Sequence, residues 1–275
     1  MTTSLCELIS TDQPIVMGIL NTTPDSFSDG GRFEQIDMAV QHALQMQAEG
    51  AQIIDVGGES TRPGAEAVSV GDELQRVIPL IESLRQHSDV IISIDTSKPE
   101  VMRAAVAAGA NLVNDVTALR APGALETCAE LDVPVCLMHM QGEPRSMQSN
   151  PSYRNVVAEV SEFLLQRKQA AMAAGIGEER ILLDPGFGFG KSLAHNLQLL
   201  KQLEQLQSLG SPLLVGLSRK SMFAAILDGA AVDQRLYASV AAAVLCWDRG
   251  ARLFRVHDVK ATVDALKVCS AMQRA

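Results

Sequence analysis

The sequence lacks an excess of basic residues. Its 275 residues include 23 Lys and Arg against 32 Asp and Glu, which gives a formal net charge of −9. A nucleic-acid-binding protein needs a basic face to neutralise phosphates, so this balance argues against such a partner. Because net charge is a sum over the whole surface, a local basic pocket remains compatible with it.

Export and membrane signals are also lacking. Residues 1–14 include Glu7 and Asp12 but no Lys or Arg, whereas a signal peptide begins with a cationic stretch. The longest tempting apolar run, 238–247, is shorter than the roughly 20 residues that span a bilayer. The five cysteines are widely spaced without a C-x-x-C pair, which disfavours a disulfide framework and a structural zinc site. We therefore expect a cytoplasmic protein with reduced thiols and no membrane contact.

The sequence does contain a regular alternation of two kinds of segment. Short apolar runs occupy 15–20, 53–56, 90–94, 112–116, 135–138, 181–183, 213–217 and 253–256. Between them, apolar residues recur at three- and four-residue spacing, typical of amphipathic helices, over 36–49, 72–85, 100–108, 153–174, 196–206 and 233–247. Such alternation predicts an α/β protein with parallel strands and right-handed crossovers.

About eight strand–helix repeats in a chain of this length predict a (β/α)8 TIM barrel. An open, doubly wound sheet is the alternative. No Pro-, Gly- or Ser-rich linker divides the chain, so we expect one domain over 1–275, with 1–14 as a short lead-in.

A polar residue stands at the end of each apolar run. These residues are Asn21, Asp55, Asp95, Asn114, His139, Asp184, Ser218 and His257. One polar residue at a strand end is ordinary in a turn, but in a parallel barrel all eight carboxyl ends meet at one mouth. Burying a carboxylate costs several kcal/mol unless it is paired. Asp95 and Asp184, each preceded by an apolar run, are therefore expected to face a ligand or cation.

Two long loops and a set of basic residues belong to the same mouth. The loops 21–31 and 57–64 are rich in Gly, Pro, Ser and Asp, and we interpret them as mobile covers over a site. Strand alternation places Arg255 and His257 on one face. As two cations, together with Arg62 and Lys220, they are predicted to form an anion clamp for phosphate.

The glycine-rich segment 184–192 ends like a Walker A loop. Pro185 stands where that motif needs glycine, so nucleotide hydrolysis through a P-loop is disfavoured. Its three glycines would instead let the backbone approach a flat ligand, with Phe187 or Phe189 offering a ring.

Taken together in order, these motifs resemble the dihydropteroate synthases. The segments that carry the resemblance are 21–31, 55–64, 95–99, 114–115, 137–142, 184–191, 218–221 and 255–259. The resemblance implies a barrel enzyme of folate biosynthesis. It would condense 6-hydroxymethyl-7,8-dihydropterin pyrophosphate with p-aminobenzoate to give 7,8-dihydropteroate and pyrophosphate.

The resemblance also implies a role for each matching residue. The pterin would be bound by Asp95, Asn114, Asp184 and Lys220, and the pyrophosphate by Thr61, Arg62, Arg255 and His257. The p-aminobenzoate pocket, which sulfonamides occupy in this family, would be lined by Phe27, Pro63, Phe189, Ser218 and Lys220. Arg62, Lys220, Arg255 and His257 would form the catalytic set, Asn21 would help bind Mg2+, and a homodimer is the family expectation.

Three other functions stay open at the level of sequence. The first is a pterin-binding methyltransfer domain, which would not need the loops holding Asn21 and Arg62, nor Arg255 with His257. The second is a Schiff-base, aldolase-type barrel that uses Lys220. The third is a non-catalytic module that binds pterin or phosphate.

Overall fold

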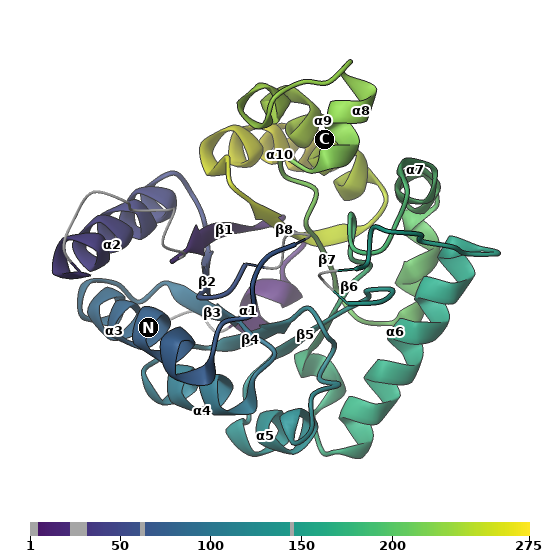
Figure 1. Cartoon of the computed structure of the whole chain (residues 1–275). Helices are drawn as coiled ribbons and strands as arrows, with labels where there is room; N and C mark the ends of the chain where they lie inside the picture. The colour runs from purple at the N-terminus through teal and green to yellow at the C-terminus, as the bar shows by residue number, and fades with distance from the viewer. Residues whose placement is uncertain (1–4, 23–31, 61–63, 144–145) are drawn as a thin grey trace.

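Eight parallel strands close into one barrel in the computed structural model, which describes residues 5–22, 32–60, 64–143 and 146–275 (Figure 1). The strands are β1 (Ile15–Asn21), β2 (Ile53–Gly57), β3 (Ile91–Asp95), β4 (Leu112–Asp115), β5 (Val135–Met138), β6 (Ile181–Asp184), β7 (Leu213–Val215) and β8 (Ala251–Val256). Each strand pairs with the next along the chain, and β8 pairs with β1 to close the circle. The predicted (β/α)8 TIM barrel is confirmed.

Helices surround the barrel as in Figure 1. They are α1 (Leu5–Ser10), α2 (Arg32–Ala48), α3 (Val70–His87), α4 (Pro99–Ala107), α5 (Ala124–Leu131), α6 (Val156–Ala173), α7 (Leu193–Lys201), α8 (Ser221–Ile226), α9 (Leu236–Asp248) and α10 (Val259–Gln273). Short 3-10 helices are η2 (Glu178–Arg180), η3 (Leu203–Leu209) and η4 (Val232–Arg235). The predicted helix over 196–206 is thus two elements, because α7 ends at Lys201 and η3 follows after one residue. Within the described chain, no helix has the length and apolarity needed to cross a bilayer.

Side-chain caps fix where two of the longer helices begin. The Ser69 hydroxyl accepts a hydrogen bond from the Asp72 N–H and starts α3 at Val70. The Asn155 side chain accepts from the N–H groups of Val157 and Ala158, so α6 starts later than the predicted 153. Each cap supplies a partner for backbone donors that a helix N-terminus leaves unpaired.

An apolar layer fills the amino-terminal half of the barrel interior. It comprises Leu5, Ile15, Met17, Ile53, Ile91, Leu112, Cys136, Leu182, Leu214 and Leu253, all buried. Leu5 belongs to α1, which lies across the centre of the barrel in Figure 1. The lead-in therefore contributes a helix that packs against this floor.

A polar layer lies directly above the apolar floor. Side chains two residues apart on a strand share a face. Two positions beyond five of the floor residues, the strands carry Asp55, Ser93, Asn114, Asp184 and Arg255. Strand periodicity alone thus aims these polar groups into the barrel at its carboxyl end, where barrel active sites form.

Candidate active site at the mouth of the barrel

Arg255 is the centre of an ion-pair network that crosses the barrel. Its Nε donates to Asp55 Oδ2 at 2.6 Å, and a terminal nitrogen donates to Asp95 Oδ2 at 2.7 Å. Both carboxylates are buried, and the Arg255 side chain is 22% exposed. Asn114 approaches the same Asp55 oxygen at 3.4 Å. The structure therefore brings Arg255, Asp95 and Asn114 together as predicted, but it finds the arginine already engaged by two carboxylates.

Asp55 is the member of this network that the sequence prediction left without a role. It is fully buried, and its Oδ1 has no hydrogen-bond partner among the described residues. A buried carboxylate oxygen without a hydrogen-bond partner is rare in folded proteins, so this atom is an unusual feature of the network. One feature of the sequence indicates that Asp55 faces the barrel interior. It lies inside the apolar run Ile53-Ile-Asp-Val, two residues after a floor residue.

Two other site carboxylates hold their protons unusually strongly. Burial raises the pKa of Asp95 to about 7, against the opposing pull of Arg255. Burial also raises the pKa of Asp184 to about 6, opposed by the Gly186 N–H that donates to its Oδ1 at 2.7 Å and by Lys220. Both groups therefore change charge near neutral pH, as expected where carboxylates serve a ligand rather than solvent.

Lys220 stands beside the start of α8, with its ammonium over an aromatic ring. The Nζ lies 4.3 Å from the centre of the Phe189 ring, a cation–π distance. Burial, together with Arg255, lowers the pKa of Lys220 to about 8, while Asp184 raises it. The lysine is thus mostly charged at neutral pH and links the predicted pterin group Asp184 to the predicted arylamine group Phe189.

His257 follows β8 and contacts Ser218, which follows β7. The Ser218 hydroxyl accepts the His257 backbone N–H at 3.1 Å and lies 3.1 Å from Nδ1 of its ring. Burial first, and then Arg255, lowers the pKa of His257 to about 4. We predicted His257 as a cation of an anion clamp, whereas this lowered pKa favours the uncharged ring, which can contribute hydrogen bonds to an anion.

Asn21 ends β1 next to Asp95. A Cβ placed on Gly57, which pairs with both residues, would lie 3.6 Å from Asn21 Oδ1 and 3.7 Å from Asp95 Oδ2, the oxygen that also accepts from Arg255. Within the described ranges there is no cluster of three His, Cys, Asp or Glu residues suited to a metal ion. A few protein oxygens completed by waters and phosphate are the environment that Mg2+ prefers.

Four of the predicted site residues lie outside the described ranges. They are Phe27 in the first loop and Thr61, Arg62 and Pro63 in the second. Their proposed contacts therefore stay predictions.

A buried Lys191–His139 pair was missed by the sequence prediction, which placed His139 among the polar residues at strand ends and gave it no further role. Lys191 Nζ donates to His139 Nδ1 at 2.9 Å and to the Gly186 carbonyl at 2.8 Å. Burial, followed by the charge of Lys191, lowers the pKa of His139 to about 2. The pair could not be predicted from a local sequence pattern, because the two residues are 52 positions apart in the chain.

This depressed pKa predicts a specific loss of stability in acid. Below pH 6.5 the unfolded chain takes up a proton at His139, whereas the folded chain does so only near pH 2, so acidification favours unfolding. Between pH 8 and pH 5 this group should lower the free energy of unfolding by about 2 kcal/mol. Urea unfolding at both pH values should show that loss in the wild type and a correspondingly smaller loss in His139→Gln. Parallel pH profiles for the two proteins would contradict the assignment.

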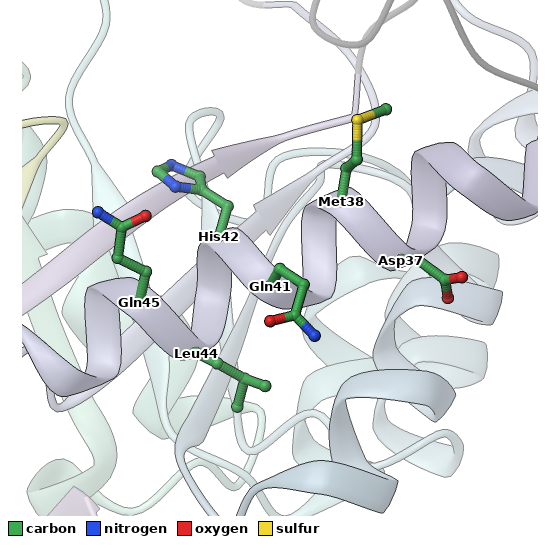
Figure 2. A pocket seen from close by; sticks show the side chains of 6 residues that line it. All are labelled: Asp37, Met38, Gln41, His42, Leu44 and Gln45. Atoms are coloured by element: carbon green, nitrogen blue, oxygen red, sulfur yellow. The ribbon is translucent and has the colours of Figure 1, made fainter.

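A surface hollow of about 570 Å³ lies away from this mouth. It is lined by Asp37, Met38, Gln41, His42, Leu44 and Gln45. Figure 2 shows that all six side chains come from consecutive turns of α2. None belongs to the polar layer, so we place the candidate active site at the barrel mouth and not in this hollow.

Comparisons with known proteins agree with this location. A sequence profile of the family described as pterin binding enzyme matches residues 17–257. Dihydropteroate synthase from Escherichia coli (strain K12) is 54% identical over 258 residues, covering 94% of this chain and 91% of that protein.

Solved structures give the same result. Xanthomonas albilineans dihydropteroate synthase with 4-aminobenzoic acid is 56% identical, with a TM-score of 0.91 over 96% of this chain and 94% of that one. The same enzyme in complex with 7,8-dihydropteroate has a TM-score of 0.87 at 53% identity, over 96% and 95% of the two chains. Because the similarity extends over nearly the whole length in sequence and in structure, this chain belongs to the dihydropteroate synthase family of pterin-binding enzymes.

Proposed function

We propose that this chain condenses 6-hydroxymethyl-7,8-dihydropterin pyrophosphate with p-aminobenzoate to form 7,8-dihydropteroate and pyrophosphate. The observation that carries the proposal is a group of polar side chains at the mouth of the barrel: Asn114 and Asp184 of the polar layer, with Asp95 and Lys220 close to them. Solved relatives more than 50% identical contain 4-aminobenzoic acid and 7,8-dihydropteroate.

The pterin fits the acceptors of this layer. Its amino group and adjacent ring N–H are two donors side by side, which a carboxylate such as Asp184 accepts with both oxygens. Asn114 can both donate and accept, and the Lys220 ammonium donates to ring acceptors.

Departure of pyrophosphate is the step that needs positive charge. The bond between the pterin methylene carbon and the pyrophosphate oxygen breaks first, leaving an electron-poor carbon conjugated to the ring. Arg255 and Lys220 stabilise the negative charge that develops on the leaving group, and neutral His257 with Ser218 supplies hydrogen bonds. The amine nitrogen of p-aminobenzoate then bonds to this carbon and releases a proton to solvent.

Mg2+ fits the oxygen atoms near Gly57. Asn21 would hold it, with Asp95 close by and with pyrophosphate oxygens and waters completing the shell. When bound, it would add charge stabilisation for the departing pyrophosphate. Asn21→Ala should raise the Mg2+ concentration needed for half-maximal turnover.

Pyrophosphate release distinguishes this function from its rivals. Release should require p-aminobenzoate, and omitting the arylamine should leave only background. A binding module would bind pterin without any release. A methyltransfer domain would transfer a methyl group from a methylated pterin instead, and a Schiff-base enzyme would be trapped on Lys220 by borohydride with a carbonyl substrate.

The proposed protein partner is a second copy of this chain. On α9, Tyr237 and Leu245 are exposed on one side of the helix, and on the adjacent α10 Val268 and Met272 are exposed one turn apart. These four residues, the α9–α10 apolar stripe, expose 85%, 44%, 70% and 68% of their surfaces, respectively. Large apolar side chains that are exposed on two adjacent helices favour association between subunits.

Charge placed in this stripe should separate the subunits. We expect Leu245→Glu to shift the wild-type dimer to monomer in sedimentation velocity, because an unpaired carboxylate would be buried at the interface. The matched control is Leu165→Glu on α6, at a residue that is 41% exposed and outside the stripe. A monomeric wild type, or equal effects of the two substitutions, would exclude this interface.

The proposed location is the cytoplasm. Cys128, Cys136 and Cys246 are buried free thiols, and Cys269 is a partly exposed one. Unpaired thiols are typical of proteins that reside in a reducing compartment.

A further inference from the structure

Lys191 places its side-chain nitrogen inside the protein at the mouth of the barrel, where burial lowers the pKa of the group to about 7 and the nearby Asp184 carboxylate opposes the shift. The residue is 3% exposed. Its Nζ donates to the carbonyl oxygens of Gly186 and Phe189 at 2.8 and 3.1 Å and to Nδ1 of His139 at 2.9 Å. These acceptors are neutral groups, and among the described residues no carboxylate oxygen is hydrogen-bonded to this nitrogen.

A second buried lysine shows the more usual arrangement. Lys168 of α6 is 4% exposed, and its Nζ donates to the Glu178 carboxylate at 2.7 Å and to the Leu209 carbonyl at 2.6 Å. Glu178 belongs to η2, which precedes β6 and therefore lies at the opposite end of the barrel. Burying an ammonium costs several kcal/mol, which a carboxylate partner offsets. Lys191 instead donates to two carbonyls of one short loop and to His139, so removing its N–H donors should release that loop.

The loop held by Lys191 is wound so tightly that it needs glycine. Gly186, Gly188 and Gly190 all have positive φ, at 67°, 80° and 60°. A Cβ on Gly186 would overlap the His139 carbonyl oxygen, and one on Gly190 would overlap the Gln141 carbonyl oxygen. The loop 185–190 is therefore pressed against the segment after β5, with the ammonium at its centre.

The same loop contacts both halves of the proposed substrate site. The Gly186 N–H donates to Asp184 Oδ1, and the Phe189 ring lies under the Lys220 ammonium. A Cβ on Gly188 would lie 3.2 Å from Lys220 Cδ, so the backbone itself touches this lysine. Any displacement of the loop moves the Phe189 ring relative to Lys220.

We propose that Lys191 is a positioning residue: its buried side-chain nitrogen donates hydrogen bonds to the Gly186 and Phe189 carbonyls and to His139, and so holds the Phe189 ring against Lys220 where the arylamine binds. This role rests on the proposed function, in which Phe189 and Lys220 line the p-aminobenzoate pocket. Lys191 itself touches neither substrate.

The test compares Lys191→Met with Lys168→Met. Each substitution replaces a buried ammonium by an apolar chain of similar length, so both should lower the free energy of unfolding. We expect only Lys191→Met to raise KM for p-aminobenzoate, by about tenfold, which corresponds to about 1.4 kcal/mol, with a smaller change in kcat. Lys191→Gln, which keeps two N–H donors, should lie between Lys191→Met and the wild type and serves if Lys191→Met does not fold.

Amide hydrogen exchange without substrate gives a second, independent readout. Exchange in 185–190 should accelerate in Lys191→Met and stay at the wild-type rate in Lys168→Met. Unchanged exchange and unchanged KM in the Lys191 variants, or equal shifts in the Lys168 variant, would overturn the proposal. An inactive wild type would instead refute the proposed function, and the exchange comparison would still decide whether Lys191 holds the loop.

Discussion

Replacing Asp184 by asparagine is expected to lower kcat/KM for the pterin ester by about a thousandfold, which corresponds to about 4 kcal/mol. The substitution keeps the shape but removes the charge that accepts two donors of the pterin edge. Each hydrogen bond to a charged group contributes about 1.5–3 kcal/mol. The new amide would also place its own N–H donors opposite the N–H donors of the pterin, where no hydrogen bond can form. The measurement is steady-state kinetics together with calorimetric titration of the pterin ester.

Asp115→Asn is the matched control for this substitution. Asp115 is also buried and ends strand β4, two strands from β6 in the barrel, but its carboxylate accepts from Thr117 and from the Leu119 N–H. It therefore holds a turn and faces no ligand, so the variant should lose stability while retaining its KM for the pterin ester. A normal kcat/KM in Asp184→Asn, or an equal loss of kcat/KM in Asp115→Asn, would contradict the proposal that Asp184 binds the pterin.

Arg255→Met should be the most destabilising of these substitutions. It leaves Asp55 and Asp95 buried without their shared cation, and breaking a buried ion pair from one side costs about 3–5 kcal/mol. Denaturant unfolding at pH 8 measures this loss. Turnover should also fall, because the leaving pyrophosphate loses its main positive group.

The pH dependence of this effect has a definite sign. Burial already raises the pKa of Asp95 to about 7, and without Arg255 it rises further. A carboxylate with a raised folded-state pKa destabilises the fold as pH rises through that pKa, so the variant should be least stable at high pH and recover part of its deficit near pH 5. Adding Asp55→Asn should restore stability without restoring turnover. An Arg255→Met protein as stable as the wild type at pH 8 would contradict the ion-pair network.

Strand positions were predictable because barrel strands are buried on both faces. Runs such as 53–56 and 135–138 are nearly continuous in apolar residues, and the intervals between them have helical period. Ends of elements were less predictable. The helix expected from 196 begins at Leu193, where the Ser192 side chain accepts the His195 N–H, and the strand expected to reach 217 ends at Val215.

The direction of a site side chain was predictable where the two-residue period of its own strand determines it. Asp95 and Asp184 stand two residues beyond an inward-facing position, so the period of two aims them into the mouth. Asp55 has the same position, but its importance comes from Arg255, 200 residues away in sequence. Such a contact leaves no local pattern.

Charge states were the least predictable feature. His257 is uncharged because it is buried beside Arg255, and Lys191 is held by carbonyls that only the folded loop brings together. A residue type gives the ordinary pKa, whereas burial and neighbouring charges fix the actual one. These quantities exist only in the assembled barrel.

The most direct measurement quantifies both products in the same quenched samples. The wild-type protein is mixed with the pterin pyrophosphate ester, p-aminobenzoate and Mg2+, and 7,8-dihydropteroate and pyrophosphate are measured over time. We expect the two products to appear in a one-to-one ratio and both to vanish when p-aminobenzoate is omitted. Pyrophosphate without dihydropteroate, or neither product at saturating substrates, would contradict the proposed condensation.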